Sequence, residues 1–466
     1  MSEPLAVHPH VLLPPGEPER GVAAELYAEV AGAPIVSPHG HVDAALLADD
    51  TPFDDPAALL VTPDHYVARL LHADGVALDE LRPPTEPRAI WRRLCEHWPA
   101  LGGTVVRLWL ELILHDVLGV RVVPSAATAD ALFDELSERL ALPESRPRAL
   151  YRRFGIEVLA TTDDPADDLR HHRALAEDPA WEGRVVPTFR PDAYLDVARP
   201  GWPARIERLA AAAGVDIAGY DDFVNALERR REFFAQHGAT ASDHGIQCLA
   251  TERLDDRTAR RIFAAALRGD SEPREAAAFG AHMLDELARM SCDDGLVMQL
   301  HPGVLRDHHG PTLRAHGADA GADIPVRAEF TRALRPLLER YGTHPRFRMV
   351  PFTVDETTFS RELAPLAGFY PSVFLGAPWW FLDSPAGMLR FRRAVTDTVG
   401  FHRTAGFVDD ARALCSIPAR HEVARRVDCA FLAELVCEHR LTLAEAAAIA
   451  RDLAHDRPLL VFRLGA

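Results

Sequence analysis

Lysine is absent from this sequence of 466 residues, so every fixed side-chain cation is one of 51 arginines. The absence excludes a Walker-type phosphate loop, a Schiff-base enzyme and a metal bridge made by a carbamylated lysine, because each of these needs a lysine amine. It leaves arginine, whose planar guanidinium group pairs with carboxylates through two parallel hydrogen bonds. A cationic pocket in this protein must therefore be built from arginine.

Other absences narrow the class of protein further. No run reaches the roughly 18 apolar residues that a membrane span needs, and residues 1–30 lack the basic and apolar regions of a signal peptide. Six cysteines occur without a Cys-x-x-Cys pair, which is typical of reduced thiols. The formal net charge of −18 argues against nucleic acid as a partner. We expect a cytoplasmic protein without a membrane partner, and the sequence leaves open whether it is a homo-oligomer.

Short apolar runs that end in polar residues indicate the fold class. There are eight, at 34–39, 157–162, 184–189, 240–244, 295–301, 346–352, 372–378 and 404–410. The run at 240–244 is the least apolar. Segments of helical periodicity separate most of them, such as 221–237 and the helix that the Thr442–Glu445 capping-box spacing begins. Alternating strands and helices predict an α/β fold, here a (β/α)₈ barrel of the TIM type, with its active site at the carboxyl ends of the strands.

The gap between the first and second runs is too long for a single crossover. Apolar patterns at 91–118 and 129–140 predict that residues 42–156 form a helical insertion. A division into two domains at this point is the alternative, but barrel strands are expected on both sides of the gap. We therefore expect one domain over 1–466, in which 42–156 form a cap.

A His-x-His pair, His39 and His41, follows the first run. Residues i and i+2 of a strand face the same side, so both imidazoles could reach one metal ion. Residues 8–10 form another such pair, but in a proline-rich stretch. Asp410 ends the eighth run and could complete the site, because the first and last strands of a closed barrel are neighbours. The alternatives are two packed or exposed histidines and, for Asp410 with Arg412, a surface ion pair.

The ends of the other strands supply a candidate substrate-binding set. It consists of Arg190, His244, His301, Trp380 and Arg412. Arg190 and Arg412 could clamp a carboxylate, and Trp380 could form an apolar wall for a sugar. Each is individually more typical of a structural residue, and only their convergence on one rim favours a site. Because rim arginines contribute little to a core, their replacement should cost activity and leave the fold intact.

These blocks together resemble the uronate (glucuronate) isomerases, a branch of the amidohydrolase superfamily, over almost the whole chain. In order they are HGH (39–41), DHYVARLLHADGV (64–76), ATTDDPADDLRHH (160–172), VVPTFRPD (185–192), ASDH (241–244), MQLHPGVLR (298–306), GAPWWFLD (376–383), DDAR (409–412) and RHEVARR (420–426). Two departures are present. Arg107-Leu108 precedes Trp109 where the family has Tyr-His, and one extra residue lies between Arg412 and Arg420.

The resemblance implies an aldose–ketose isomerase of the metal-dependent hydrolase type of barrel. Its expected substrates are D-glucuronate and D-fructuronate, with D-galacturonate and D-tagaturonate as a second pair. One divalent metal ion, expected to be Zn²⁺, would be held by His39, His41 and Asp410. His65 and Tyr66, which have no local signal of their own, would join Arg190 and Arg412 in contacting the substrate or moving protons.

The chemistry requires a proton to leave C2 and a proton to reach C1 of the open sugar. We expect Asp410 to deprotonate a ring hydroxyl and Tyr66 or His65 to move the carbon-bound proton, with Arg412 in a catalytic role beside them. A tyrosine base would need nearby cations, for which Arg190 and Arg412 are the candidates. The alternatives are a metal-dependent amidohydrolase or lactonase on the same barrel and a non-catalytic sugar-acid-binding protein.

Overall fold

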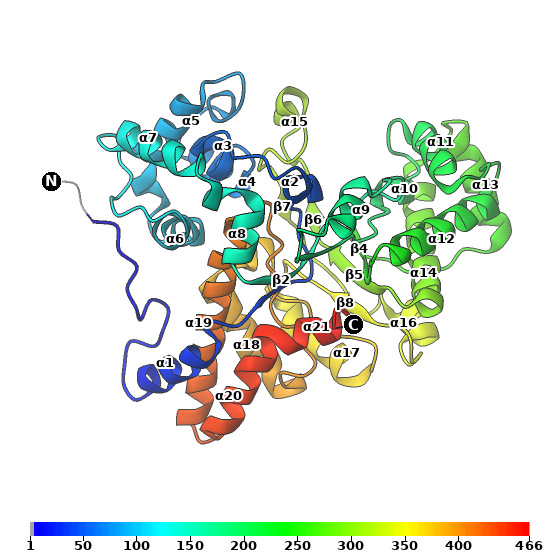
Figure 1. Cartoon of the computed structure of the whole chain (residues 1–466). Coiled ribbons are helices and arrows are strands. Elements are labelled where there is room, and N and C mark those ends of the chain that lie inside the picture. Colours follow the sequence, from blue (N-terminus) through cyan, green and yellow to red (C-terminus); the bar gives the residue numbers. More distant parts are fainter. Residues whose placement is uncertain (1–3, 466) are drawn as a thin grey trace.

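Short parallel strands lie in the middle of the molecule with helices around them (Figure 1). The computed structural model describes residues 4–465. The strands are β1 (Ile35–Ser37), β2 (Ile156–Ala160), β3 (Arg184–Val186), β4 (Ala241–Ile246), β5 (Val297–Pro302), β6 (Val304–Leu305), β7 (Ile324–Pro325) and β8 (Met349–Pro351). Strands and helices alternate through the chain, which confirms the α/β class.

Parallel pairing links all of these strands except β6 and β7 into one series. β1, β2 and β3 form one parallel sheet, and β4, β5 and β8 form a second. Single parallel bridges make the remaining links, which are Phe189 to Ser242, Met349 to Val373, Leu375 to Thr404 and Gly40 to Ala411. The last link returns the series to the segment after β1, so Gly40 and Ala411 lie side by side although they are far apart in the sequence.

Six of the eight predicted runs overlap a named strand. The other two, 372–378 and 404–410, take part only through the single bridges, and Gly406 interrupts the second with a φ of 76°. The least apolar run, 240–244, overlaps β4. This strand pairs along its whole length with β5, and on its other side Ser242 is bridged to Phe189 in the segment after β3. The antiparallel hairpin of β6 and β7 was not predicted, because two-residue strands have no periodicity to detect.

The segment between β1 and β2 is mostly helical. Its helices, with short 3₁₀ or π turns labelled η, are α2 (Ala44–Asp49), α3 (Pro56–Leu60), α4 (His65–Ala73), η1 (Leu78–Leu81), α5 (Pro87–Glu96), η2 (Trp98–Leu101), α6 (Val105–Leu112), η3 (Ile113–Val117), α7 (Ala129–Leu140), η4 (Pro143–Ser145) and α8 (Pro147–Arg153). The helix predicted at 129–140 is confirmed as α7. The pattern at 91–118 is divided, because Pro99 lies in a 3₁₀ turn and Gly103 has a φ of 79°. Helices α3 to α7 lie together on one side of the strands (Figure 1).

Other helices cover the remaining sides. They are α1 (Glu19–Val30), α9 (Arg170–Glu177), α10 (Asp192–Leu195), α11 (Trp202–Ala213), α12 (Tyr220–Gln236), α13 (Asp256–Leu267), α14 (Pro273–Asp294), α15 (Gly310–His316), α16 (Arg335–Tyr341), η5 (Glu356–Thr358), η6 (Phe359–Leu363), α17 (Ala364–Phe369), η7 (Trp380–Leu382), α18 (Pro385–Val399), α19 (Ser416–Cys437), α20 (Leu443–Arg451), η8 (Asp452–Asp456) and α21 (Arg457–Val461). The predicted capping box is confirmed at α20, where Thr442 and Glu445 each accept the other's backbone N–H. Among residues 4–465, no helix is long and apolar enough to cross a membrane.

Strands β1, β5 and β8 are buried along their whole length, so both of their faces are covered, as is typical of parallel sheets. In β5 every residue is buried. Neighbouring residues of β8 belong to different apolar clusters, since Met349 packs with the helices α11 to α14 and Val350 packs with residues of the 42–156 segment. Side chains at the ends of these strands are therefore held by a rigid frame.

Candidate active site

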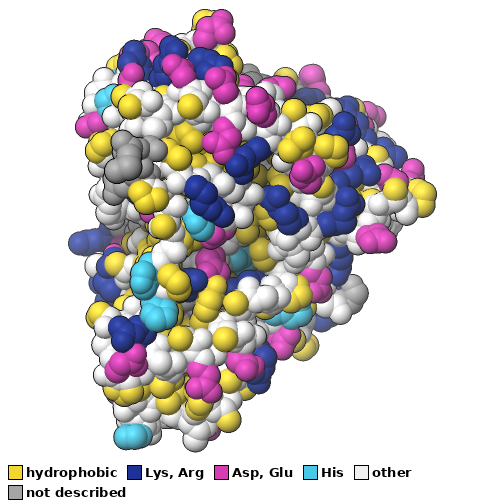
Figure 2. Space-filling view, turned by 60° about the vertical axis from the view of Figure 1, so that its left-hand side comes forward, with side chains coloured by type: hydrophobic (Ala, Val, Ile, Leu, Met, Phe, Trp, Pro, Cys, Tyr) yellow, Lys and Arg dark blue, Asp and Glu magenta, His cyan; other side chains and the backbone are white. Residues whose placement is uncertain are grey.

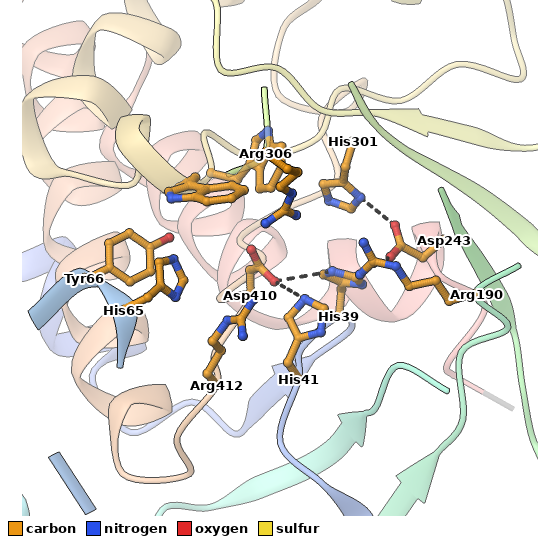
Figure 3. A pocket seen from close by; sticks show the side chains of 12 residues that line it. His39, His41, His65, Tyr66, Arg190, Asp243, His301, Arg306, Asp410 and Arg412 are labelled. Carbon is orange, nitrogen blue, oxygen red and sulfur yellow. Dashed lines mark hydrogen bonds and ion pairs between the residues drawn. The ribbon is translucent and has the colours of Figure 1, made fainter. Parts of the chain in front are cut away.

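The two predicted histidines and the predicted aspartate meet after β1. The Nε2 atoms of His39 and His41 lie 3.4 Å and 3.1 Å from Oδ1 of Asp410. His39 is fully buried, whereas the side chain of His41 keeps 24% of its exposure. Figure 3 shows both rings on the same side of the Asp410 carboxylate, with a dashed line from the carboxylate to each ring. These distances satisfy the geometric expectation that the three side chains can share one ion.

Backbone pairing explains why residues so far apart in the sequence meet. Gly40, between the histidines, forms a parallel bridge with Ala411, and the His41 N–H donates to the Ala411 carbonyl at 2.7 Å. A β-carbon on Gly40 would lie 3.3 Å from the Ala411 carbonyl oxygen, so glycine allows the close approach. Asp410 has a φ of 46°, a backbone conformation that is uncommon for a non-glycine residue and is often found at functional sites.

These three residues fit a divalent metal ion. Their ligand atoms all lie within 4.8 Å of one another. Oδ1 of Asp410 and Nδ1 of His39 are buried without a hydrogen-bond partner among the described residues. Burial raises the pKa of Asp410, but His39 and His41 outweigh it and hold that pKa well below its usual value. An ionised carboxylate beside two imidazoles is the donor set that metals such as zinc favour.

A second cluster of potential ligands shares His39. Asp243 and His301 have ligand atoms within 4.8 Å of it. In this cluster Oδ1 of Asp243 contacts Nδ1 of His301 at 2.6 Å, and its Oδ2 lies 3.1 Å from Nη1 of Arg190. Because the Asp243 carboxylate is already engaged on both oxygens, we favour the cluster with Asp410 as the metal site.

His65 and Tyr66 face the same cavity from α4. The side chain of Asp64 starts this helix by accepting the Tyr66 N–H at 2.8 Å. The rings of His65 and Tyr66 stack with centroids 4.4 Å apart, and His65 meets the edge of Trp380 at 5.5 Å. In Figure 3 the Tyr66 hydroxyl points towards Asp410. The 42–156 segment thus delivers these two residues to the strand ends.

The pKa values of His65 and Tyr66 do not match the expectation that Arg190 and Arg412 would make Tyr66 a base. Burial raises the pKa of Tyr66 above its ordinary value, and the charge of Arg420 offsets only part of the rise. Arg420 lies 5.3 Å from the Tyr66 ring, so it, rather than Arg190 or Arg412, is the cation in contact with the phenol. Burial and the charge of Arg412 lower the pKa of His65 to about 3. Both ring nitrogens of His65 lack a partner among the described residues, so a neutral imidazole and a protonated phenol face the cavity.

The two predicted arginines, Arg190 and Arg412, differ in how strongly acidic side chains of the protein already pair with them. The Nε atom of Arg190 donates to Asp192 at 2.8 Å, and its Nη1 lies 3.1 Å from the fully buried Asp243. Among residues 4–465, Arg412 has one, longer ion pair, at 3.4 Å to Oδ1 of Asp319. The Arg190 charge is therefore largely neutralised by the protein, and Arg412 has more capacity to bind an added anion.

All but one of the ten predicted site residues line a single cavity. The exception is His244, which is fully buried with its Nε2 3.2 Å from Oγ of Ser242. Successive residues of a strand face opposite sides, and it is the preceding residue, Asp243, that lines the cavity. Figure 2 shows the surface hollowed on the face with histidine, acidic and arginine side chains around the hollow. His41, Arg190, Arg306 and Arg412 also line an adjoining mouth cavity of about 620 Å³.

Asp243, Arg306 and Trp379 line the cavity without having been selected from the sequence. Asp243 belongs to the ASDH block, but the sequence does not reveal the register that separates it from His244. Arg306 is the last residue of the MQLHPGVLR block, and its place in that block was the one feature of the sequence that could have identified it. The departure at Arg107 lies outside the cavity, since Arg107 hydrogen-bonds Glu111 and the Trp98 carbonyl.

Comparisons with known proteins agree with this geometry. Residues 18–462 match the glucuronate isomerase family. A curated uronate isomerase from Rhizorhabdus wittichii is 51% identical over 465 residues, which cover 99% of this chain and 100% of that protein. The crystal structure of glucuronate isomerase from Caulobacter crescentus has a TM-score of 0.97 at 46% identity, covering 100% of this chain and 98% of that one. A uronate isomerase structure from Thermotoga maritima has a TM-score of 0.93 at 31% identity, covering 98% and 99%.

The family match extends over nearly the whole chain, and the most similar relatives are covered from end to end. Seven of the nine blocks that carried the resemblance contribute residues to one cavity in the structure. The chain therefore belongs to the glucuronate isomerase family.

Proposed function

We propose that this chain is a uronate isomerase that interconverts D-glucuronate and D-fructuronate, and D-galacturonate and D-tagaturonate as a second pair. The observation that carries the proposal is the meeting of His39, His41 and Asp410 with three arginines around one cavity, in a chain of this family. We further propose that the parallel series is a closed (β/α)₈ barrel with 42–156 as its cap, and that the enzyme acts in the cytoplasm. The hydrolase alternative is not favoured, because the full-length relatives are named uronate isomerases.

His39, His41 and Asp410 would hold one divalent ion, which we propose is zinc. When bound, such an ion supplies a positive charge that polarises a nearby sugar oxygen. The remaining steps are derived for the side chains themselves.

Asp410 is suited to open the sugar ring. Its carboxylate is ionised, because its pKa lies well below the usual value. It takes the proton of the anomeric hydroxyl, the C1–O5 bond breaks with its electron pair on O5, and the carboxyl group returns the proton to O5. The open aldehyde is thereby formed with no net change in Asp410.

His65 and Tyr66 are suited to the transfer between C2 and C1. Neutral His65 takes the C2 proton while protonated Tyr66 donates to O1, and the C–H electron pair becomes the double bond of an enediol. The imidazolium then delivers its proton to C1, and Tyr66 recovers a proton from O2, which leaves a ketone at C2. The pKa directions fix the starting protonation states for this scheme, with His65 neutral and Tyr66 protonated.

Incubation of the metal-loaded protein with each uronate in D₂O tests the proposal. Nuclear magnetic resonance should detect the keto product and its deuterium content, and Asp410→Asn should abolish turnover. Formation of no keto product from either uronate, together with hydrolysis of an amide or lactone, would overturn the proposed activity. The matched control is Asp116→Asn, an exposed aspartate outside the cavity.

A further inference from the structure

A single carboxylate oxygen bridges two arginines at the mouth of the cavity. Oδ1 of Asp319 lies 3.4 Å from Nη1 of Arg306 and 3.4 Å from Nη2 of Arg412. Both arginines line the inner cavity as well as its mouth, whereas Asp319 lines only the mouth. The protein's own side chain thus shows that one carboxylate fits between these two guanidinium groups.

Arg306 is held in place independently of Asp319. Its Nη1 lies 3.2 Å from Oδ2 of Asp323, a buried carboxylate that also accepts the backbone N–H of Asp307 at 2.6 Å. Its guanidinium group lies 4.4 Å from the centre of the Trp380 ring, within the range of a cation–π contact. These contacts would keep Arg306 at the cavity wall after Asp319 had moved away.

Asp319 is weakly held by comparison. Its side chain keeps 46% of its exposure, and both of its contacts to arginine are long and use the same oxygen. Partly exposed ion pairs of this kind contribute little, about 0–1 kcal/mol. A ligand carboxylate that offers two oxygens to the two arginines makes shorter, charge-assisted hydrogen bonds than Asp319 makes.

Arg190 is the less suitable partner for a substrate carboxylate. It already contacts Asp192 and Asp243 at 2.8 Å and 3.1 Å. An anion placed there would meet two carboxylates that are already present. The cation that sequence reasoning paired with Arg412 is therefore replaced, for this purpose, by Arg306.

We propose that Arg306 and Arg412 together bind the substrate carboxylate and that Asp319 occupies this position until the substrate displaces it. The inference rests on the proposed function for the identity of the substrate, a hexuronate. It adds a specificity-determining residue, Arg306, and an exchange of one carboxylate for another when the substrate binds.

Three variants test the exchange by steady-state kinetics on D-glucuronate. Arg306→Met should raise KM at least 10-fold and change kcat less than 3-fold. Asp319→Asn should lower KM by 3- to 10-fold, because the competing carboxylate is lost. In the Arg306→Met background, Asp319→Asn should no longer lower KM. Asp196→Asn is the matched control, since it removes the same charge from the same mouth without contacting either arginine.

Binding measurements separate this inference from the proposed activity. Isothermal titration calorimetry measures binding at the carboxylate site without turnover. The two ligands are D-glucarate, which carries carboxylates but cannot isomerise, and neutral D-glucitol. The inference is supported if Asp319→Asn binds glucarate more tightly, Arg306→Met binds it more weakly, and neither change alters glucitol binding. This support holds even if no uronate is turned over. An equal gain in Asp196→Asn and Asp319→Asn, or unchanged glucarate binding in Arg306→Met, would overturn it.

Discussion

Replacement of Arg190 by methionine should destabilise the protein, contrary to the expectation for a rim arginine. Arg190 contacts Asp192 and Asp243, and the side chain of Asp243 is only 1% exposed. Loss of one partner from a buried pair costs about 3–5 kcal/mol, because the remaining charge stays buried without compensation. Since a quarter of the Arg190 side chain is exposed, we expect the lower end of this range.

The expected change can be expressed as a melting temperature. An unfolding entropy of about 2.1 cal/mol/K per residue gives about 1 kcal/mol/K for 466 residues that unfold together. A loss of about 3 kcal/mol therefore lowers Tm by roughly 3 °C. Arg412→Met is the control, because its partly exposed pair with Asp319 predicts a loss of no more than about 1 kcal/mol. Arg412→Met should nevertheless lower kcat/KM on uronates by at least about 100-fold, because it removes one of the two arginines proposed to bind the substrate carboxylate.

Differential scanning calorimetry of the two variants measures this contrast. A double variant, Arg190→Met with Asp243→Asn, should recover more than half of the lost Tm, because the unpaired charge is removed together with its partner. If Arg190→Met and Arg412→Met melt at the same temperature as the parent, the buried pair does not stabilise the fold and the reasoning fails.

Three further changes follow from the site and its surroundings. Asp410→Asn should lower the metal content of the purified protein at least about 10-fold by atomic absorption, and an unchanged content would place the metal elsewhere. Tyr66→Phe should lower kcat by about 100-fold with little change in KM, and a fully active variant would remove Tyr66 from proton transfer. Burial raises the pKa of Asp163 from 3.8 to about 7, so the stability it contributes is present below pH 3.8 and is lost as pH rises through 7. Asp163→Asn should make Tm fall less over this pH interval. An unchanged pH dependence of Tm would contradict a raised pKa for Asp163. Its neighbouring charged or titratable groups are Asp43, Asp167 and His172.

The sequence predicted the order of elements better than their register. Apolar runs mark strands because both faces of a parallel strand are buried, and the ends of those runs located His39, His41 and Asp410 correctly at one place. Which of Asp243 and His244 faces the cavity depends on a one-residue register, which no pattern in a short run of mixed polarity determines.

Long-range contacts were the other limit. Nothing in the sequence indicates that Arg190 is neutralised by Asp243 or that Asp319 contacts Arg412, because each pair joins different strands or loops. His65 and Tyr66 were found only through the family resemblance, since a pair at the start of a helix has no local signal of function.

The bridge between Gly40 and Ala411 also has a consequence for synthesis of the protein. His39 and His41 leave the ribosome early, but Asp410 follows only when most of the chain has been made. At about 5–20 residues per second, the interval is on the order of tens of seconds. During that time a nascent chain offers the two imidazoles without the carboxylate. On the proposed assignment of the metal ligands, the full set of three therefore exists only in chains that are nearly complete.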